Sequence, residues 1–99
     1  MLWSIHCLDR PNGSELRART RPRHLDYLVK AKDKVLFCGP LLSADGQAML
    51  GSLFIVKLPG SAEAEAFAKG DPYAEAGLFE SVVIRRVRAH LFEPALAKE

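Results

Sequence analysis

The chain has 99 residues, of which 48% are hydrophobic and 26% charged, and its formal net charge at pH 7 is +2. This length predicts one domain, and this composition is that of a globular protein rather than a disordered or fibrous one. A charge this small argues against nucleic acid as a partner, because nucleic-acid-binding domains carry a larger basic excess. A chain of this length buries only about 60–65% of its unfolded surface, so a second copy would help to stabilise it.

Further sequence features predict a cytoplasmic protein without a membrane partner. No apolar run reaches the roughly 20 residues that cross a bilayer, and the N-terminus lacks the basic and long apolar regions of a signal peptide. Cys7 and Cys38 lie in strand-like apolar runs without metal-ligand spacing, which favours reduced thiols in the core. Arginines gather at positions 17, 19, 21 and 23 and at 85, 86 and 88. We predict that these are solvated surfaces, an anionic small ligand being the alternative.

The first third of the chain predicts a strand followed by helical segments. Leu2 to Leu8 alternates in the manner of a strand, with residues 3, 5 and 7 on one face and residues 2, 4, 6 and 8 on the other. After a loop over residues 9–13, Ser14 is predicted to cap a short helical turn over residues 15–19. Pro22 then predicts a fresh helix start, because proline is tolerated only in a first turn. A helical apolar repeat predicts the stripe that faces the core, at Leu25, Leu28, Val29 and Lys32.

The middle of the chain predicts a β-hairpin. Val35–Leu42 reads as a strand in which Gly39-Pro40 marks a bend or a sheet edge, because proline cannot donate to a ladder. Residues 43–46 form a turn with the Asp-Gly hairpin signal. The return strand, Met49–Leu58, is apolar on both faces, and Gly51 within it predicts a bulge or a close backbone approach.

The last part predicts two helices and a strand. Ser61 is predicted to cap a helix over residues 62–69 that Gly70 ends. Asp71 and Pro72 open a short helix that Gly77 closes. The final strand covers residues 79–87, its charged end fits a sheet edge, and residues 93–99 are predicted to fray.

This β-α-β-β-α-β order predicts a ferredoxin-like α+β domain over residues 1–92, followed by a C-terminal tail over residues 93–99. Its four-stranded antiparallel sheet would carry the helices on one face. The other face is apolar and needs cover, so we predict a homodimer in which two sheets face each other and enclose a barrel-like interior.

Several short motifs in this order resemble one known family. They are the segment from Met1 to Asp9, Arg-Pro-x-His-Leu at 21–25, Gly39-Pro40, the strand from Gly51, and Asp71-Pro72-Tyr73 with Ala76-Gly77-Leu78-Phe79. Together they resemble the YciI-like family (YCII-related domain) over residues 1 to about 92. The resemblance implies a dimeric α+β barrel, similar to that of muconolactone isomerase, with an active site around a histidine and an aspartate. By motif position these are His24 and Asp71. The activities it implies are lyase or isomerase-like steps on small ring compounds, and His6 departs from the aromatic or aliphatic residue usual in relatives.

The residues themselves support a proton-transfer pair, although each also has a structural explanation. His24 is predicted in the first turns of its helix, where the dipole and nearby arginines would lower its pKa and keep the imidazole neutral, as a general base requires. The alternative is a histidine that packs against the sheet or forms a hydrogen bond with a loop. Asp71 is a natural N-cap, and its second oxygen could still orient His24 as in hydrolase triads. No serine or cysteine at a strained elbow accompanies them, which argues against covalent catalysis.

Six other residues are predicted to shape the pocket. Ser4 and His6 share the strand face that would line the barrel interior; the others are Arg21, Gly39, Pro40 and Tyr73. A packed tyrosine and a plain bend are the alternatives for Tyr73 and for Gly39-Pro40. No two of the three histidines have ligand spacing, so we predict neither a metal nor a cofactor.

Two functions follow from these residues. The first is a small-molecule enzyme of lyase or isomerase type, in which His24 is the general base or acid and Asp71 orients it. The second is a non-catalytic module of the same fold that binds a small molecule or serves as an accessory domain.

Overall fold

The computed structural model describes residues 1–98 as one ferredoxin-like α+β unit. In chain order its elements are β1 (Leu2–Asp9), α1 (Ser14–Lys30), β2 (Val35–Leu42), β3 (Met49–Lys57), α2 (Ser61–Gly70), α3 (Pro72–Glu75), β4 (Phe79–Val87) and the 3₁₀ helix η1 (Pro94–Ala97). The predicted order of strands and helices is confirmed.

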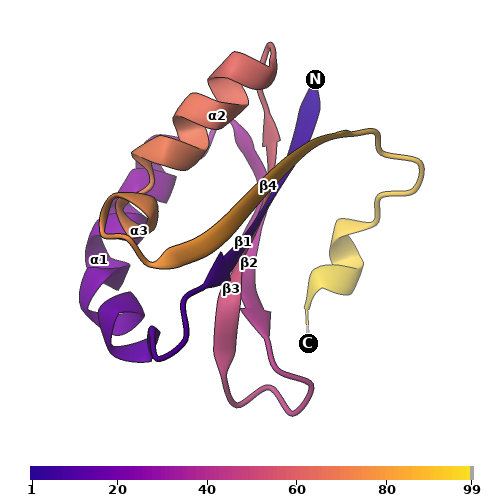
Figure 1. Cartoon of the computed structure of the whole chain (residues 1–99). Helices are drawn as coiled ribbons and strands as arrows, with labels where there is room; N and C mark the ends of the chain where they lie inside the picture. Colours follow the sequence, from indigo (N-terminus) through magenta and orange to yellow (C-terminus); the bar gives the residue numbers. More distant parts are fainter. Residues whose placement is uncertain (99) are drawn as a thin grey trace.

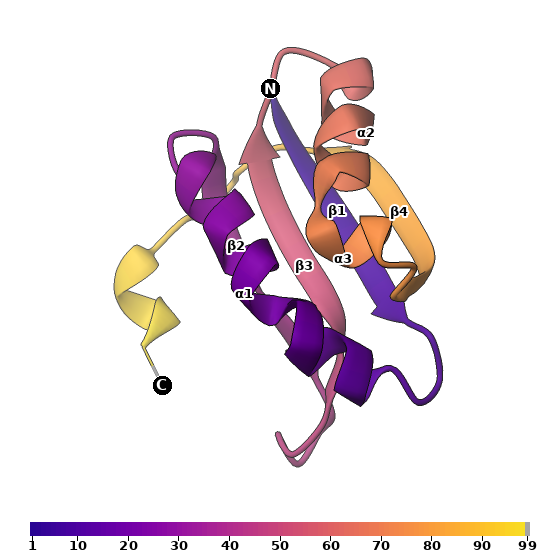
Figure 2. The ribbon, with the colours of Figure 1, turned by 90° about the vertical axis from the view of Figure 1, so that its left-hand side faces the viewer.

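The strands form one antiparallel sheet in the order β2-β3-β1-β4, so β3 and β1 are central and β2 and β4 are edges. Figure 1 shows the helices on one side of this sheet and the C-terminal segment on the other. Seen from the helical side in Figure 2, α1 lies in front of β2 and β3, whereas α2 and α3 lie in front of β1 and β4. The predicted arrangement of helices on one face is therefore confirmed.

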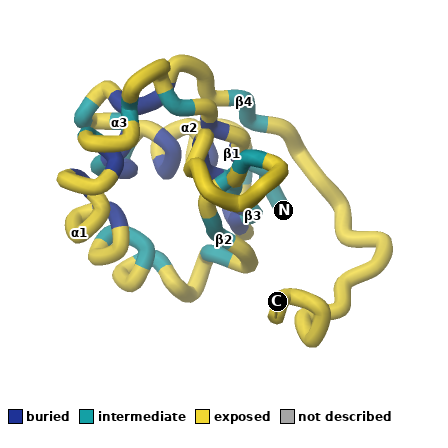
Figure 3. The backbone as a smooth tube through the Cα atoms, turned by 90° about the horizontal axis from the view of Figure 1, so that it is seen from below, coloured by how far each residue is buried: buried dark blue, intermediate teal, exposed yellow. Residues whose placement is uncertain are grey.

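The core lies between the sheet and the helices. Ile5 and Cys7 of β1 point into it, as their predicted strand face requires. They meet Phe54 of β3, Phe67 of α2 and other side chains that are at most 9% exposed. Figure 3 shows this buried layer on the inner sides of the helices and strands, while the C-terminal segment is exposed along its length.

Two special residues in the hairpin have the places predicted for them. Pro40 lies in the edge strand β2, where the sheet needs no further hydrogen bond from it. At Gly51 a Cβ atom would lie 1.9 Å from the carbonyl oxygen of Cys7, so β1 and β3 approach too closely there for any side chain. The predicted close backbone approach is confirmed.

The first helix differs from its prediction. α1 is one helix from Ser14 to Lys30, and Pro22 lies inside it rather than at a new start. The proline forfeits only the hydrogen bond to the Ala18 carbonyl, on an exposed part of the helix, and the packing on both sides holds the helix together.

The buried stripe of α1 was predicted only in part. Of the predicted residues Leu28 packs against the core, whereas Leu25 and Val29 are 40% and 64% exposed. The fully buried residues of α1 are Arg17, Thr20 and His24. The apolar pattern was misleading because polar side chains occupy the face that meets the sheet. This stripe of polar residues forms part of the site described below.

Neither predicted serine cap is present. Ser14 and Ser61 are the first residues of α1 and α2, the N-cap positions are Gly13 and Gly60, and no side chain caps either helix. The N-terminus of α3 is as predicted: the Asp71 side chain accepts a hydrogen bond from Tyr73 N–H, and Pro72 opens the helix.

The tail predicted to fray forms a short 3₁₀ helix, in which the Glu93 carboxylate accepts a hydrogen bond from Ala95 N–H. Residue 99, the end of the predicted tail, lies outside the described residues. No helix among residues 1–98 is long and apolar enough to cross a membrane.

Candidate active site

His24 and Asp71 meet in the interior between α1 and α3. His24 Nδ1 lies 2.8 Å from Asp71 Oδ1, and the two side chains are 8% and 1% exposed. A carboxylate accepts hydrogen bonds, so this contact places the proton on Nδ1 and leaves a lone pair on Nε2. Within residues 1–98 no hydrogen bond occupies Nε2. The contact predicted from the sequence is therefore present.

A single carboxylate oxygen performs both tasks of Asp71. Oδ1 accepts from His24 Nδ1 and also caps α3 through Tyr73 N–H at 3.0 Å. Oδ2 is buried and has no hydrogen-bond partner among the described residues. The prediction that the second oxygen would orient His24 is wrong, because capping and orienting use the same atom.

Aromatic rings fix the plane of the imidazole. Tyr73 stacks on His24 with ring centroids 3.9 Å apart and planes 20° from parallel, and Phe54 meets the imidazole ring edge-on at 6.1 Å. Tyr73 is 1% exposed, so both interpretations of this residue hold: it is a packed tyrosine that also lines the cavity.

The position of His24 in its helix differs from the prediction. It is the eleventh residue of α1, in the middle of the helix rather than in its first turns. The influence of a helix dipole fades within the first turn, so the predicted dipole effect on His24 does not apply. Its environment is instead set by the buried carboxylate and the stacked phenol ring.

A cavity of about 160 Å³ opens beside the His24 ring, between α1 and the β2–β3 hairpin. Its lining combines three charged or titratable side chains of α1 with residues of the sheet and α3: Arg17, Arg21, His24, Leu25, Leu28, Cys38, Gly39, Pro40, Met49, Ser52 and Tyr73. Because Asp71 engages Nδ1, Nε2 is the nitrogen of His24 that is available to a ligand. A dry cavity of about 150 Å³ accepts one benzene-sized ring, so the volume suits a small single-ring molecule.

The predicted pocket residues divide into two groups. Arg21, Gly39, Pro40 and Tyr73 line this cavity together with His24. Ser4 and His6 do not: they pair with Ile55 and Leu53 on the opposite face of the sheet, and Ser4 Oγ donates to the Arg85 carbonyl oxygen at 3.3 Å. Their predicted place in the interior of a barrel stays a prediction, because that interior would lie between the helix-free faces of two sheets.

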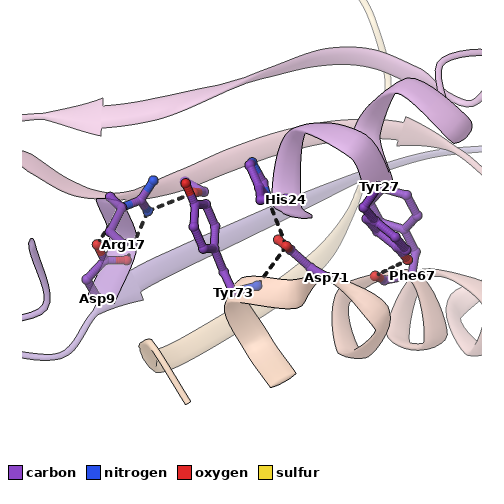
Figure 4. Close-up of polar contacts among 8 residues, drawn as sticks. Asp9, Arg17, His24, Tyr27, Phe67, Asp71 and Tyr73 are labelled. Atoms are coloured by element: carbon purple, nitrogen blue, oxygen red, sulfur yellow. Dashed lines mark hydrogen bonds and ion pairs between the residues drawn. The ribbon is translucent and has the colours of Figure 1, made fainter. Parts of the chain in front are cut away.

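Arg17 was predicted to lie on a solvated surface, but it belongs to the site. The side chain is buried at 5% exposure and forms an ion pair with Asp9, through Nε at 2.7 Å and Nη2 at 3.0 Å. Nη2 also donates to Ser52 Oγ at 2.9 Å, and the guanidinium lies 4.5 Å from the centre of the Tyr73 ring. Figure 4 shows Arg17, Tyr73 and His24 in one row, with Asp9 and Asp71 beneath its two ends.

Burial and neighbouring charges set the protonation of the lining side chains. Burial disfavours the charged form of Arg17, but the hydrogen bond and charge of Asp9 outweigh it and raise its pKa. Burial raises the pKa of Tyr73 despite the opposing charge of Arg17, so the phenol remains a hydrogen-bond donor at neutral pH. Burial and the charge of Asp71 raise the pKa of Cys38 to about 11, which keeps this thiol protonated.

Cys7 and Cys38 are both free, as predicted, and Cys7 is buried in the core. Within residues 1–98 no group of three His, Cys, Asp or Glu side chains is placed to hold a metal ion.

Comparison with known proteins identifies the family. The profile of the YCII-related domain matches residues 1–88. This chain belongs to the YCII-related domain family. Protein YciI of Escherichia coli is 32% identical over 92 residues, covering 86% of this chain and 94% of YciI. An uncharacterized YCII relative from Haemophilus influenzae is 30% identical over the same shares of the two chains.

One solved structure extends the YCII comparison to a protein with a named activity. It is the 5-chloro-2-hydroxyhydroquinone dehydrochlorinase TftG from Burkholderia phenoliruptrix, in complex with 2,5-dihydroxybenzoquinone. It superimposes with a TM-score of 0.83 at 34% identity, covering 89% of this chain and 94% of TftG. The resemblance to the YCII family inferred from the sequence motifs is thus confirmed, and a structural neighbour acts on a small ring compound.

Proposed function

We propose that this protein is an enzyme of lyase or isomerase type in which His24 moves a proton on a small ring compound. The observation that carries the proposal is the buried contact of His24 Nδ1 with Asp71 beside a ring-sized cavity. The activity named for TftG, the removal of hydrogen chloride from a ring compound, supports this reaction class.

The chemistry follows from the tautomer. Nε2 accepts a proton from a C–H or O–H group of the bound ring, and the imidazolium that forms is stabilised by the buried Asp71 carboxylate at Nδ1. The electron pair left behind forms a new double bond. In an elimination a leaving group departs with its own pair, whereas in an isomerisation the proton returns from Nε2 to another atom of the ring.

The experiment uses 5-chloro-2-hydroxyhydroquinone as a trial substrate and measures the release of chloride. We expect His24→Ala to lower the rate by roughly 10²–10⁴-fold, the usual contribution of a general base. His90→Ala is the matched control, because His90 is exposed beyond the end of β4 and does not line the cavity, so this variant should turn over substrate at the wild-type rate.

The result also distinguishes the enzyme from a binding module. A module would bind 2,5-dihydroxybenzoquinone without turnover, and His24→Gln would preserve that binding. Chloride release that is unchanged in His24→Ala would refute the proposed role of His24.

We propose further that two copies pair through the face of the sheet that carries no helices. This face exposes large apolar side chains, among them Leu8 at 42% and Phe37 at 47%, and the neighbouring Leu53 and Ile55 are only partly buried. Sheets pack face to face at about 10 Å with their side chains interleaved, so a second copy of this apolar face would cover the first.

A further inference from the structure

Arg17 brings an unused pair of N–H donors to the cavity. Its Nε and Nη2 are held by Asp9 and Ser52, and no hydrogen bond within residues 1–98 occupies Nη1. Arg17 lines the cavity and is 5% exposed, and its hydrogen bonds to Asp9 and Ser52 fix its orientation before any ligand arrives. A charged donor that is held in place in this way is suited to bind an anionic oxygen.

Tyr73 separates this cation from the base. Its ring lies 4.5 Å from the Arg17 guanidinium and 3.9 Å from the His24 ring, and Figure 4 shows its hydroxyl next to the guanidinium. One aromatic ring therefore spans the distance between the two groups. A ligand of similar size could contact the base with one side and the cation with the other.

The opening of the cavity carries a second cation. Arg21 lines it one helical turn after Arg17, is exposed, and forms no ion pair within residues 1–98. The two carboxylates nearby are each already engaged, Asp9 with Arg17 and Asp71 with His24. The free donors at this end of the cavity thus favour a negatively charged ligand.

We propose that Arg17 Nη1 and the Tyr73 hydroxyl bind an ionised oxygen of the ligand, so that the site takes single-ring compounds bearing a phenolate or enolate oxygen. The inference rests on the proposed function, because it assigns the cation end of the cavity whose other end is His24. The oxygen held by Arg17 keeps its charge while Nε2 removes a proton from another atom of the ring, and the cation offsets the additional negative charge that the ring then carries.

The test compares ionised and neutral rings of equal shape by titration calorimetry at pH 8. The pairs are 2,5-dihydroxybenzoquinone with 2,5-diaminobenzoquinone, and 4-nitrophenolate with 4-nitroaniline. A hydrogen bond to a charged group contributes about 1.5–3 kcal/mol, so we expect the ionised member to bind wild-type protein about tenfold or more tightly.

The variants remove the cation without leaving an unpaired buried carboxylate. Asp9→Asn/Arg17→Gln replaces both partners of the ion pair, so that no buried charge is left without its partner. We expect it to abolish the preference for ionised rings and to bind the neutral rings as wild type does. Arg19→Gln, which removes one exposed charge from the same helix, should retain the preference.

Tyr73→Phe provides a second measurement if the double variant does not fold, because it removes one hydroxyl and keeps the stacked ring. It should weaken binding of the ionised rings only. The inference is overturned if neither ionised ring binds wild-type protein, if both members of each pair bind equally, or if neither variant changes the preference.

Failure of this inference is distinguishable from failure of the proposed function. His24→Ala should keep the preference for ionised rings, because the cation end of the cavity is untouched. If turnover depends on His24 but ionised rings are not preferred, only the proposed role of Arg17 is excluded. If ionised rings are preferred but no turnover is found, only the proposed proton-transfer reaction is excluded.

Discussion

At the scale of single residues, one oxygen atom of Asp71 links the start of α3 to the protonation of His24. Oδ1 accepts both Tyr73 N–H and His24 Nδ1–H, so the acceptor cannot rotate away without losing the cap. The tautomer of the histidine is thereby tied to the local fold. This coupling predicts how substitutions at Asp71 will behave.

Asp71→Asn should keep the fold and the tautomer, because an amide oxygen also caps a helix and accepts the imidazole proton. We expect its unfolding free energy to lie within about 0.5 kcal/mol of wild type, while Asp71→Ala loses about 1 kcal/mol or more with the cap. Urea denaturation measures these energies, and two-bond ¹H–¹⁵N spectra measure the tautomer. A proton found on Nε2 in the wild-type protein would contradict the assigned arrangement.

The buried thiols predict a loss of stability at high pH. Burial is the largest cause that raises the pKa of Cys7 to about 12 and that of Cys38 to about 11, above the ordinary thiol value of 9.0. Above pH 9 the unfolded chain releases these protons while the folded chain keeps them, so the unfolding free energy falls as pH rises from about 9 towards 11–12. Below pH 9 the thiols are protonated in both the folded and the unfolded chain, so they do not change the unfolding free energy with pH.

The measurement is the unfolding free energy at a series of pH values, compared with Cys7→Ala/Cys38→Ala. At neutral pH the variant is less stable because it loses buried side chains, but its slope between pH 9 and 11 should be flatter than that of wild type. Because each pKa unit corresponds to about 1.4 kcal/mol, the difference should amount to a few kcal/mol at most. Equal slopes would show that the folded thiols titrate normally.

At the scale of elements, Gly51 marks a close approach of β3 to β1. A Cβ atom there would overlap the carbonyl oxygen of Cys7, and that oxygen belongs to the backbone of a central strand. Gly51→Ala must therefore push β1 and β3 apart, and we expect it to cost about 3 kcal/mol or more or to prevent folding.

Gly39→Ala is the matched control, since it lies in a strand of the same hairpin. Its Cβ would meet only the Phe37 ring at 3.6 Å, an ordinary contact, so its unfolding free energy should stay within about 1 kcal/mol of wild type. Chemical denaturation of both variants checks the pair. Similar stabilities would mean that the sheet relaxes around the added methyl group.

The sequence was sufficient for the order of elements because strand alternation, Gly and Pro are local signals. It was insufficient for α1, where Pro22 suggested a break and the apolar residues suggested the wrong face. The signal for Arg17 was present, because it precedes His24 by seven residues, which is two helical turns on the same face. This spacing is informative only if α1 is known to be one continuous helix. The packing that maintains α1 through Pro22 involves residues distant in sequence, so the sequence pattern does not show that continuity.

The residues of the site were likewise predictable only where they belong to local sequence motifs. The contact between His24 and Asp71 was predictable because both belong to recognisable motifs, a helix of the Arg-Pro-x-His-Leu type and an Asp-Pro cap. Ser52 was not predicted as a site residue, although it shares the inward face of β3 with the buried Phe54. A polar residue at an inward strand position is the signal for such a partner, and the ion pair that needs it forms only in the folded chain.

At the scale of the whole molecule, the fold leaves two unlike surfaces. The face of the sheet under the helices buries its apolar residues, whereas the opposite face exposes them and is flanked by a C-terminal segment that includes Leu91 at 91% and Phe92 at 59% exposure. A domain of about 100 residues has little stability to spare, and exposed apolar area of this extent is seldom left uncovered. The uncovered face thus marks where a second copy would pack.

Leu53→Glu tests this pairing, because Leu53 lies on the uncovered face of the central strand β3 between His6 of β1 and Gly39 of β2. A charge buried between two sheets is unpaired and costly, so the variant should be monomeric and less stable than wild type. Light scattering coupled to size-exclusion chromatography measures the mass. Val29→Glu, on the exposed side of α1, is the control and should remain a dimer. A wild-type chain that elutes as a monomer at micromolar concentration, or a Leu53→Glu variant that stays dimeric, would exclude pairing through this face while leaving the His24 site intact.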